Sequence, residues 1–218
     1  MLEAVLFDWS NTLVRFTWDD ELLAAGHRAA LGRDDPAFTE RYRDLVFASV
    51  GRPYDELLRE LGVDDPDAFV DAEHDVWLAA HEVLAAAPAL LEALRGRGLK
   101  TGLVANSWPD PPRVLRADAE RFGLAALLDV QVWSEEVGAR KPDAAIFEHA
   151  LQELDVDPSA ALFVGDRLDA DVQGAAEVGM STAQAVWFRA DDSPVGTEPD
   201  FMAFTPMDVL NATRRLAL

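Results

Sequence analysis

Acidic, amide and lysine side chains recur where short apolar stretches of the sequence end. The four polar segments are residues 8–13, 105–107, 140–142 and 165–171. They supply four carboxylates and one lysine, Lys141, and of the carboxylates Asp8, Asp166 and Asp171 are the candidates for a shared site. Carboxylate oxygens are ligands that Mg²⁺ prefers, and an ionised carboxylate held beside a cation can act as a nucleophile. The segments therefore predict metal-assisted nucleophilic chemistry, provided that the fold brings them together.

A regular alternation of strands and helices predicts that the fold brings the four polar segments together. Strands are predicted at residues 4–7, 101–105, 130–133, 161–164 and 182–188, and helices at 89–97, 112–122, 143–154 and 170–178. This order is typical of an α/β protein with a doubly wound parallel sheet, covered by helices on both faces. Ligands of such sheets bind at the carboxyl ends of the strands, where all four polar segments are expected.

A long helical stretch interrupts this alternation after the first strand. Between residues 18 and 87 the apolar positions recur three and four residues apart, and glycine-containing turns divide the stretch into about four helices. We therefore predict a core made of residues 1–15 and 88–218, with a helical insertion at residues 16–87 placed over the carboxyl ends of the strands.

Composition narrows the classes of function. The chain has 218 residues, half of them hydrophobic, a formal charge of −21 and no cysteine. The charge disfavours nucleic acid as a partner, and the lack of cysteine excludes disulfides and thiolate chemistry. No apolar run is long enough to cross a membrane, and the first residues lack a secretory pattern, so we expect a cytoplasmic protein. No feature of the sequence indicates an oligomeric state.

The motifs resemble those of the haloacid dehalogenase (HAD) superfamily, in its branch with a helical cap inserted after the first strand. Asp8 and Thr12 match the first motif, Lys141 with Pro142 the third, and Gly165, Asp166 and Asp171 the fourth. The resemblance spans nearly the whole chain and rests on the order and spacing of the motifs. It implies a Rossmann-like core and assigns residues 16–87 to the cap.

The resemblance also implies roles for the matched residues. Asp8 would attack the substrate and form an aspartyl intermediate, with Mg²⁺ held by Asp8, Asp166 and the backbone carbonyl of Ser10. Lys141 would neutralise Asp8 and the transferred group, while Asp171 would hold Lys141 or a water on the metal. The remaining contacts, hydrogen bonds to the phosphoryl oxygens or to the nucleophile loop, are expected from Thr12 and Asn106.

Two positions depart from the family pattern. Ser10 stands where the family has the aspartate that acts as general acid and base, and a serine hydroxyl is too weak an acid for that role. Ala105 stands where the second motif has a hydroxyl, which Ser107 could replace. Arg52, in a turn of the insertion, is a candidate for binding a remote anionic group of the substrate.

The four histidines, His27, His74, His81 and His149, show no metal-ligand spacing in the sequence, so packing or surface positions are predicted for them, although a cap histidine could supply the missing proton.

The leading functional hypothesis is a Mg²⁺-dependent phosphatase of a small phosphorylated metabolite. Three alternatives remain open. A carbon–phosphorus hydrolase of the phosphonoacetaldehyde type would use a cap lysine, and residues 16–88 contain none. A dehalogenase would not need the acidic positions of the fourth motif. A catalytically impaired member would bind a phosphorylated ligand or a partner without turnover, which would account for Ser10 and Ala105.

Overall fold

The structure is a computed structural model that describes residues 1–17, 19–188 and 197–217. Its chain divides into two compact units. The core unit comprises Met1–Arg15, Val83–Asn106 and Ala119–Leu218, and the helical unit comprises Phe16–Glu82 and Ser107–Asp118. Helix α6 (Pro112–Arg121) contributes residues to both units.

The core unit is built on one parallel sheet of six strands. The strands are β1 (Ala4–Phe7), β4 (Lys100–Ala105), β5 (Val130–Trp133), β6 (Ala161–Gly165), β7 (Ser181–Ala185) and β8 (Phe201–Ala203). Their spatial order is β5-β4-β1-β6-β7-β8, so β1 lies between β4 and β6. All four residues of β1 are buried, which explains why this central strand is a continuous apolar run.

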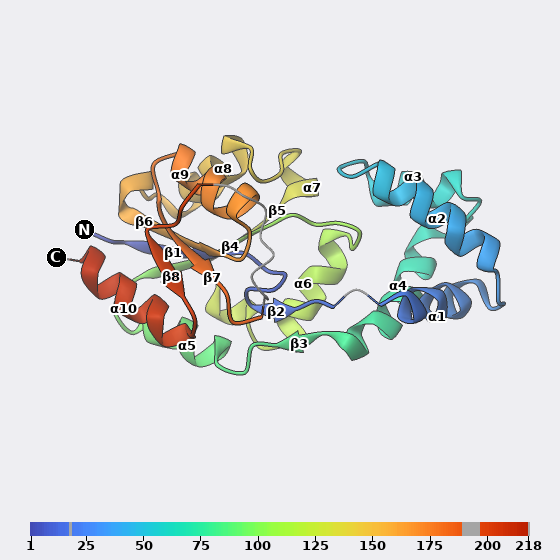
Figure 1. The fold of residues 1–218 in the computed structure, drawn as a ribbon, viewed down its shortest axis with the longest axis horizontal. Helices are drawn as coiled ribbons and strands as arrows, with labels where there is room; N and C mark the ends of the chain where they lie inside the picture. The colour runs from blue at the N-terminus through green and yellow to red at the C-terminus, as the bar shows by residue number, and fades with distance from the viewer. Residues whose placement is uncertain (18, 189–196, 218) are drawn as a thin grey trace. The chain divides into compact units, whose positions relative to one another are not determined.

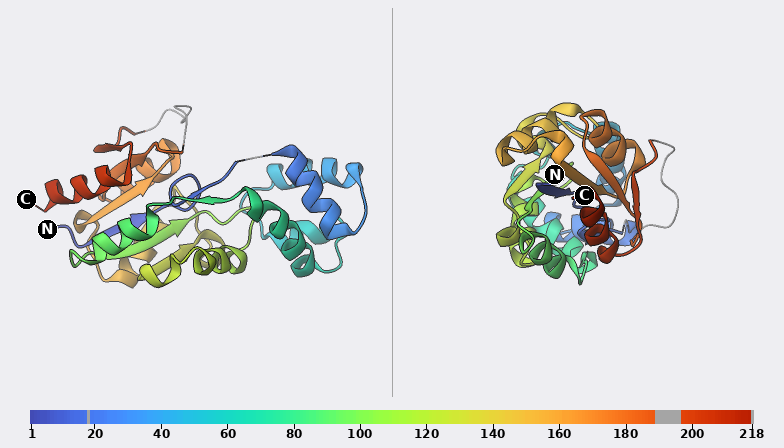
Figure 2. Two further views of the ribbon diagram at one scale, coloured as in Figure 1. Left: turned by 90° about the horizontal axis from the view of Figure 1, so that it is seen from below. Right: turned by 90° about the vertical axis from the view of Figure 1, so that its left-hand side faces the viewer.

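Helices cover both faces of the sheet, with α8 and α9 on one face and α5 and α10 on the other (Figure 1). These helices are α5 (Ala87–Arg95), α8 (Ala144–Leu154), α9 (Gln173–Glu177) and α10 (Pro206–Leu216). Met1 and the end of α10 lie close together on this unit in each view (Figure 2). The arrangement confirms the predicted doubly wound α/β fold.

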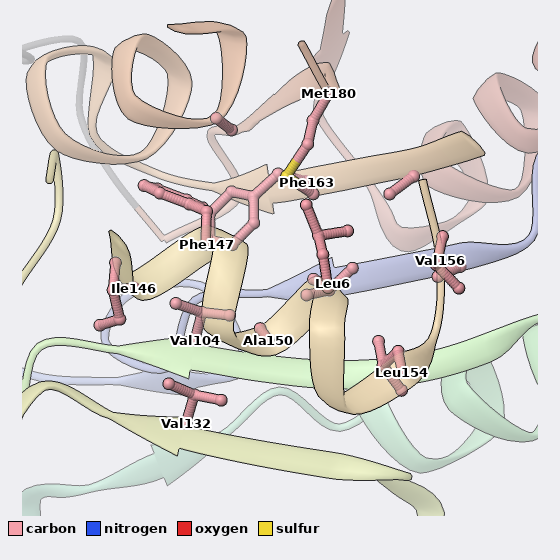
Figure 3. Close-up of a cluster of buried hydrophobic side chains, with 14 of the residues drawn as sticks. Leu6, Val104, Val132, Ile146, Phe147, Ala150, Leu154, Val156, Phe163 and Met180 are labelled. Carbon is pink, nitrogen blue, oxygen red and sulfur yellow. The ribbon is translucent and has the colours of Figure 1, made fainter. Parts of the chain in front are cut away.

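The apolar face of α8 forms much of the core beneath one side of the sheet (Figure 3). Phe147 stacks edge-on against Phe163 of β6, with ring centroids 5.1 Å apart. Leu6 and Val104, from β1 and β4, complete the contact surface and are fully buried. This packing fixes β1, β4 and β6 relative to one another, and so fixes the residues that follow them.

Short elements make up the rest of this part of the chain. They are β2 (Val14–Arg15), β3 (Glu82–Val83), η2 (Ala125–Leu127), α7 (Ser134–Val137), η3 (Pro158–Ala160) and the π-helix η4 (Leu168–Val172). Strands β2 and β3 form a separate two-stranded sheet.

The helical unit contains four helices and a 3₁₀ turn among the described residues of its first segment. They are α1 (Asp20–Leu31), α2 (Pro36–Ala48), α3 (Tyr54–Glu60), α4 (Pro66–Trp77) and η1 (Leu78–Ala80). The aspartates before α1, α2 and α4 each accept hydrogen bonds from backbone N–H groups of the first turn. Such caps, with proline at the start of α2 and α4, set where these helices begin.

The structure differs from the predicted elements at several ends. The last predicted strand, 182–188, ends at Ala185, and the predicted helix 170–178 is the π-helix η4 followed by α9. Strand β8 and helix α10 were not predicted. The segment Ser107–Asp118 groups with the helical unit, although it was predicted to belong to the core. None of the described helices is long and apolar enough to cross a bilayer.

Candidate active site

The polar segments converge because their strands are neighbours in the sheet. Phe7, the last residue of β1, is in register with Leu103 of β4 and Val164 of β6. Asp8 therefore emerges beside the ends of both strands, and its backbone N–H donates to the Val164 carbonyl over 2.9 Å. Asp166 directly follows β6 in the same place. The sheet thus brings together carboxylates that lie far apart in the sequence.

Lys141 lies at the centre of these carboxylates. Its Nζ donates to Asp8 Oδ1 over 2.5 Å and lies 2.6 Å from Asp171 Oδ1. All three side chains are buried. Burial by itself lowers the pKa of Lys141, but Asp171 and Asp8 outweigh burial and raise that pKa above its ordinary value. Lys141 is therefore held as an ammonium ion.

The acidic cluster, which we define as Asp8, Asp166 and Asp171, carries more negative charge than Lys141 can offset. One carboxylate oxygen from each residue lies within 4.8 Å of those from the other two. Burial raises the pKa of Asp8 to about 7, and the carboxylates of Asp171 and Asp166 add to this, although Lys141 opposes it. Three buried carboxylates against one ammonium form a donor set that fits a hard divalent cation.

The backbone of Lys141 is fixed by Asn106, which follows β4. The Asn106 side chain donates from Nδ2 to the Lys141 carbonyl over 3.1 Å and accepts from the Lys141 N–H over 2.8 Å. Both ends of its amide are thus engaged with Lys141. Substrate binding by Asn106 stays a prediction, but in this structure the side chain positions the lysine.

Gly165 is required by the close approach of Asp171. A Cβ atom at position 165 would lie 2.4 Å from Cγ and Oδ2 of Asp171. The same Oδ2 accepts the backbone N–H of Arg167 over 3.0 Å, which closes the turn into the π-helix η4. The glycine of the fourth motif therefore allows the Asp171 carboxylate to pack against β6 and reach Lys141.

The two departures from the family pattern have different surroundings. Ser10 is exposed, and its backbone forms an isolated β-bridge with Val14. Ala105 is buried at the end of β4. Thr12 is also buried, and its Oγ1 has no hydrogen-bond partner among the residues that the structure describes. Its carbonyl accepts from Trp187 Nε1 over 2.9 Å, which anchors the loop after β1.

Arg52 and Ser107 belong to the helical unit. The Arg52 guanidinium donates to Glu60 over 2.5 Å and lies 3.8 Å from Glu56, so its charge is already offset by neighbouring carboxylates. Ser107 is buried. The predicted contacts of both residues with a substrate stay predictions.

Sequence reasoning missed Gln184, whose Nε2 donates to the Asp166 carbonyl over 3.1 Å. The other side chains of β7 are small, and most of its residues are buried. A glutamine in such a strand indicates a hydrogen-bonded contact, because a buried amide needs a partner. The histidines occupy packing and surface positions, as predicted, since His27 and His74 are buried and His149 is exposed. His74 and His81 lie close to Asp118, and the three offer ligand atoms within 4.8 Å of one another.

A doubly wound sheet with buried carboxylates and a lysine at its strand ends is an arrangement typical of α/β enzymes. A model of the haloacid dehalogenase-like hydrolases matches residues 2–179. The chain is 32% identical to glyceraldehyde 3-phosphate phosphatase of Methanopyrus kandleri, over 100% of this chain and 99% of that protein. It is 28% identical to N-acetylmuramic acid 6-phosphate phosphatase of Pseudomonas aeruginosa, over 98% and 96%.

The fold is shared with solved structures as well. The HAD phosphatase from Thermococcus onnurineus superposes with a TM-score of 0.73 at 23% identity, covering 97% of this chain and 98% of that one. The chain belongs to the haloacid dehalogenase-like hydrolase family. This confirms the resemblance seen in the motifs, and the names of the relatives agree with the predicted phosphatase class.

Proposed function

We propose that this protein is a Mg²⁺-dependent phosphatase that removes a phosphoryl group from a small phosphorylated metabolite, with Asp8 as the nucleophile. The observation that carries the proposal is the contact of Asp8 with Lys141 inside a group of three buried carboxylates. The relatives support the choice of a phosphate ester, because they are phosphatases of glyceraldehyde 3-phosphate and of N-acetylmuramic acid 6-phosphate.

The acidic cluster, with the carbonyl of Ser10, would hold Mg²⁺. When bound, this ion offsets the repulsion between a carboxylate nucleophile and an anionic phosphoryl group. Lys141 contributes a second positive charge at the same place, because its ammonium lies against Asp8. The excess of carboxylates over ammonium is the structural reason to expect a cation here.

The reaction then proceeds on Asp8 itself. Its carboxylate oxygen forms a bond to phosphorus while the bond from phosphorus to the substrate oxygen breaks, and the leaving oxygen departs with the electron pair. Water next attacks the phosphorus of the aspartyl phosphate, which restores the Asp8 carboxylate and releases inorganic phosphate. Asn106 and Asp171 act by holding Lys141 in position for both steps.

Proton transfer is the weak step of this site. The leaving alkoxide needs a proton, and the Ser10 hydroxyl cannot donate one effectively near neutral pH. We therefore infer a slow turnover of alkyl phosphates. We also propose that the helical unit serves as the cap of the active site, with Arg52 or Ser107 as its candidate substrate contacts. Residence in the cytoplasm stays a prediction.

Turnover of an aryl phosphate with Mg²⁺ tests the proposal directly. We expect wild-type protein to release phosphate and Asp8→Asn to lose all measurable turnover, because an amide cannot act as the nucleophile. Asp143→Asn is the matched control, since Asp143 is an exposed aspartate two residues from Lys141 and should be dispensable. A screen of phosphorylated metabolites would then identify the preferred substrate.

The departures at Ser10 and Ala105 favour one second candidate, a protein that binds a phosphorylated ligand without hydrolysing it. The same experiment separates the two. If wild type and Asp8→Asn are equally inactive on every aryl phosphate and metabolite, while phosphorylated compounds still raise the melting temperature of both, the binding role replaces the phosphatase.

A further inference from the structure

The helical unit contains a second group of metal-ligating side chains, away from the acidic cluster in sequence. His74 lies in α4, His81 directly follows η1, and Asp118 lies in the part of α6 that belongs to this unit. His74 Nε2 lies 3.0 Å from Asp118 Oδ2, and His81 Nδ1 lies 3.7 Å from the same oxygen. One ligand atom from each residue lies within 4.8 Å of the others.

These three side chains are buried and incompletely satisfied. Their exposed fractions are 9% for His74, 4% for His81 and 2% for Asp118. Within the described part of the chain, His81 Nδ1 has no hydrogen-bond partner, and Asp118 Oδ2 has only the ion-pair contact with His74 Nε2 at 3.0 Å. The separation of 3.7 Å between His81 Nδ1 and Asp118 Oδ2 is too long for a hydrogen bond. Buried polar atoms are almost always paired, so the unpaired His81 nitrogen, which faces the Asp118 carboxylate, calls for a further participant.

The second nitrogen of His74 faces a carboxylate at ion-pair distance, although it makes no hydrogen bond within the described residues. His74 Nδ1 lies 3.4 Å from Asp110 Oδ1, on the opposite side of the ring from Asp118. A metal-bound histidine typically gives its other ring N–H to a carboxylate, which fixes the tautomer that leaves the first nitrogen free to ligate. Asp110 is placed to do this for His74.

We propose that His74, His81 and Asp118 form a binding site for a divalent transition-metal ion of the Zn²⁺ type, with Asp110 orienting His74. Two imidazole nitrogens and one carboxylate are a ligand set that Zn²⁺ accepts, with water completing the four-coordinate shell. Mg²⁺ is disfavoured because it prefers oxygen ligands. The site is thus chemically distinct from the acidic cluster, which has no histidine ligand.

The ion would act as a structural clamp inside the helical unit. His74 and Asp118 are 44 positions apart in the sequence and lie on different helices. A ligand that binds only the folded state stabilises it, so the ion should hold the segment Ser107–Asp118 against the end of α4. Neither histidine is used in the proposed reaction on Asp8.

Zn²⁺ binding by the full chain tests the proposal. The background is Asp166→Asn, which removes one ligand of the acidic cluster, and Mg²⁺ is kept in excess so that the cluster does not take up Zn²⁺. Equilibrium dialysis should give one Zn²⁺ per chain. Adding Co²⁺ in place of Zn²⁺ should produce the visible absorption of a four-coordinate nitrogen and oxygen site.

Substitutions of the proposed ligands and of Asp110 should reduce Zn²⁺ binding to different extents. His81→Ala and Asp118→Asn should lose the bound Zn²⁺ and the Co²⁺ absorption. Asp110→Asn should weaken Zn²⁺ binding by about 10–100-fold, the usual effect of removing the carboxylate behind a metal-bound histidine. His149→Ala is the matched control, because His149 is an exposed histidine on α8 and its loss should leave binding unchanged.

Two results would overturn the proposal. One is a failure of the background protein to retain Zn²⁺, in which case the four side chains form only a hydrogen-bonded group. The other is retention of Zn²⁺ with unchanged affinity by both His81→Ala and Asp118→Asn. Circular dichroism of each metal-free variant shows whether it is folded, and Asp110→Asn gives an independent reading if either ligand variant fails to fold.

Discussion

Replacing Lys141 by methionine tests the charge balance of the active site most directly. Methionine is of similar length and removes only the ammonium. Lys141 is the single positive charge in contact with Asp8 and Asp171 among the described residues, and all three side chains are buried. The substitution therefore leaves three buried carboxylates without a cation unless a metal is bound.

The expected loss follows from that arrangement. Removing one partner of a buried ion pair costs about 3–5 kcal/mol, because the remaining charge stays buried and unpaired. For a chain of this size, each 1 kcal/mol shifts the melting temperature by about 2–4 °C, so the core transition should fall by about 6–20 °C.

The loss should depend on pH. Lys141 lowers the pKa of Asp8, which is about 7 with the lysine present, so its removal raises that pKa further. The native state then binds a proton that the unfolded chain, with an ordinary carboxyl pKa, releases. Stability should consequently increase as the pH falls through the raised pKa, and the defect should be largest above it.

Differential scanning calorimetry in a chelating buffer is the appropriate assay, because it measures the melting temperature while no metal is bound. Lys100→Met is the matched control. Lys100 is the one other lysine of the sequence, lies at the start of β4 and donates to the Leu154 carbonyl, so its loss should cost about 1 kcal/mol. If Lys141→Met is as stable as Lys100→Met at pH 8 without metal, the account of a charge-strained acidic cluster is wrong.

Four further outcomes are expected. Mg²⁺ should raise the melting temperature of the wild-type protein, because at 100 times its Kd it adds about 2.7 kcal/mol to the free energy of unfolding. Equal melting curves of wild type with Mg²⁺ and with chelator would contradict the metal site. Aryl phosphates should be hydrolysed faster than alkyl phosphates, and equal initial rates would reveal another proton donor. Ser10→Asp should accelerate alkyl phosphate turnover by up to ~10²–10⁴, and kinetics of Ala105→Thr and of the double variant would show whether the two deficits are coupled. Gly165→Ala should destabilise the core by about 1–3 kcal/mol and reduce phosphate release, because its Cβ would displace Asp171; unchanged melting and turnover would contradict the proposed packing.

The class of fold could be predicted from the amino-acid sequence. Strand β1 is buried on both faces, so its apolar run AVLF was visible without any tertiary information. The later strands alternate with amphipathic helices, and this order leaves a doubly wound sheet as the natural solution. The elements that were missed, β8 and α10, lie after the last matched motif, where Phe201–Ala203 is too short to give a clear strand pattern.

The sequence also identified the ionic partners of the site, because their types and their places at strand ends are properties of local pattern. It could not give their contacts. Asn106 forms two hydrogen bonds with the backbone of Lys141, and Gly165 leaves space for the Asp171 carboxylate. Both contacts depend on how β4, β6 and the turn before α8 are placed in the folded chain.

Contacts between side chains that lie far apart in the sequence could be seen only in the folded protein. The raised pKa of Asp8 results from burial and from carboxylates supplied by another segment of the chain, neither of which a local pattern contains. His74, His81 and Asp118 show the same limit, because no spacing rule connects a histidine on α4 with an aspartate on α6. Local pattern fixes which elements form, whereas burial and electrostatics depend on the neighbours that the folded chain supplies.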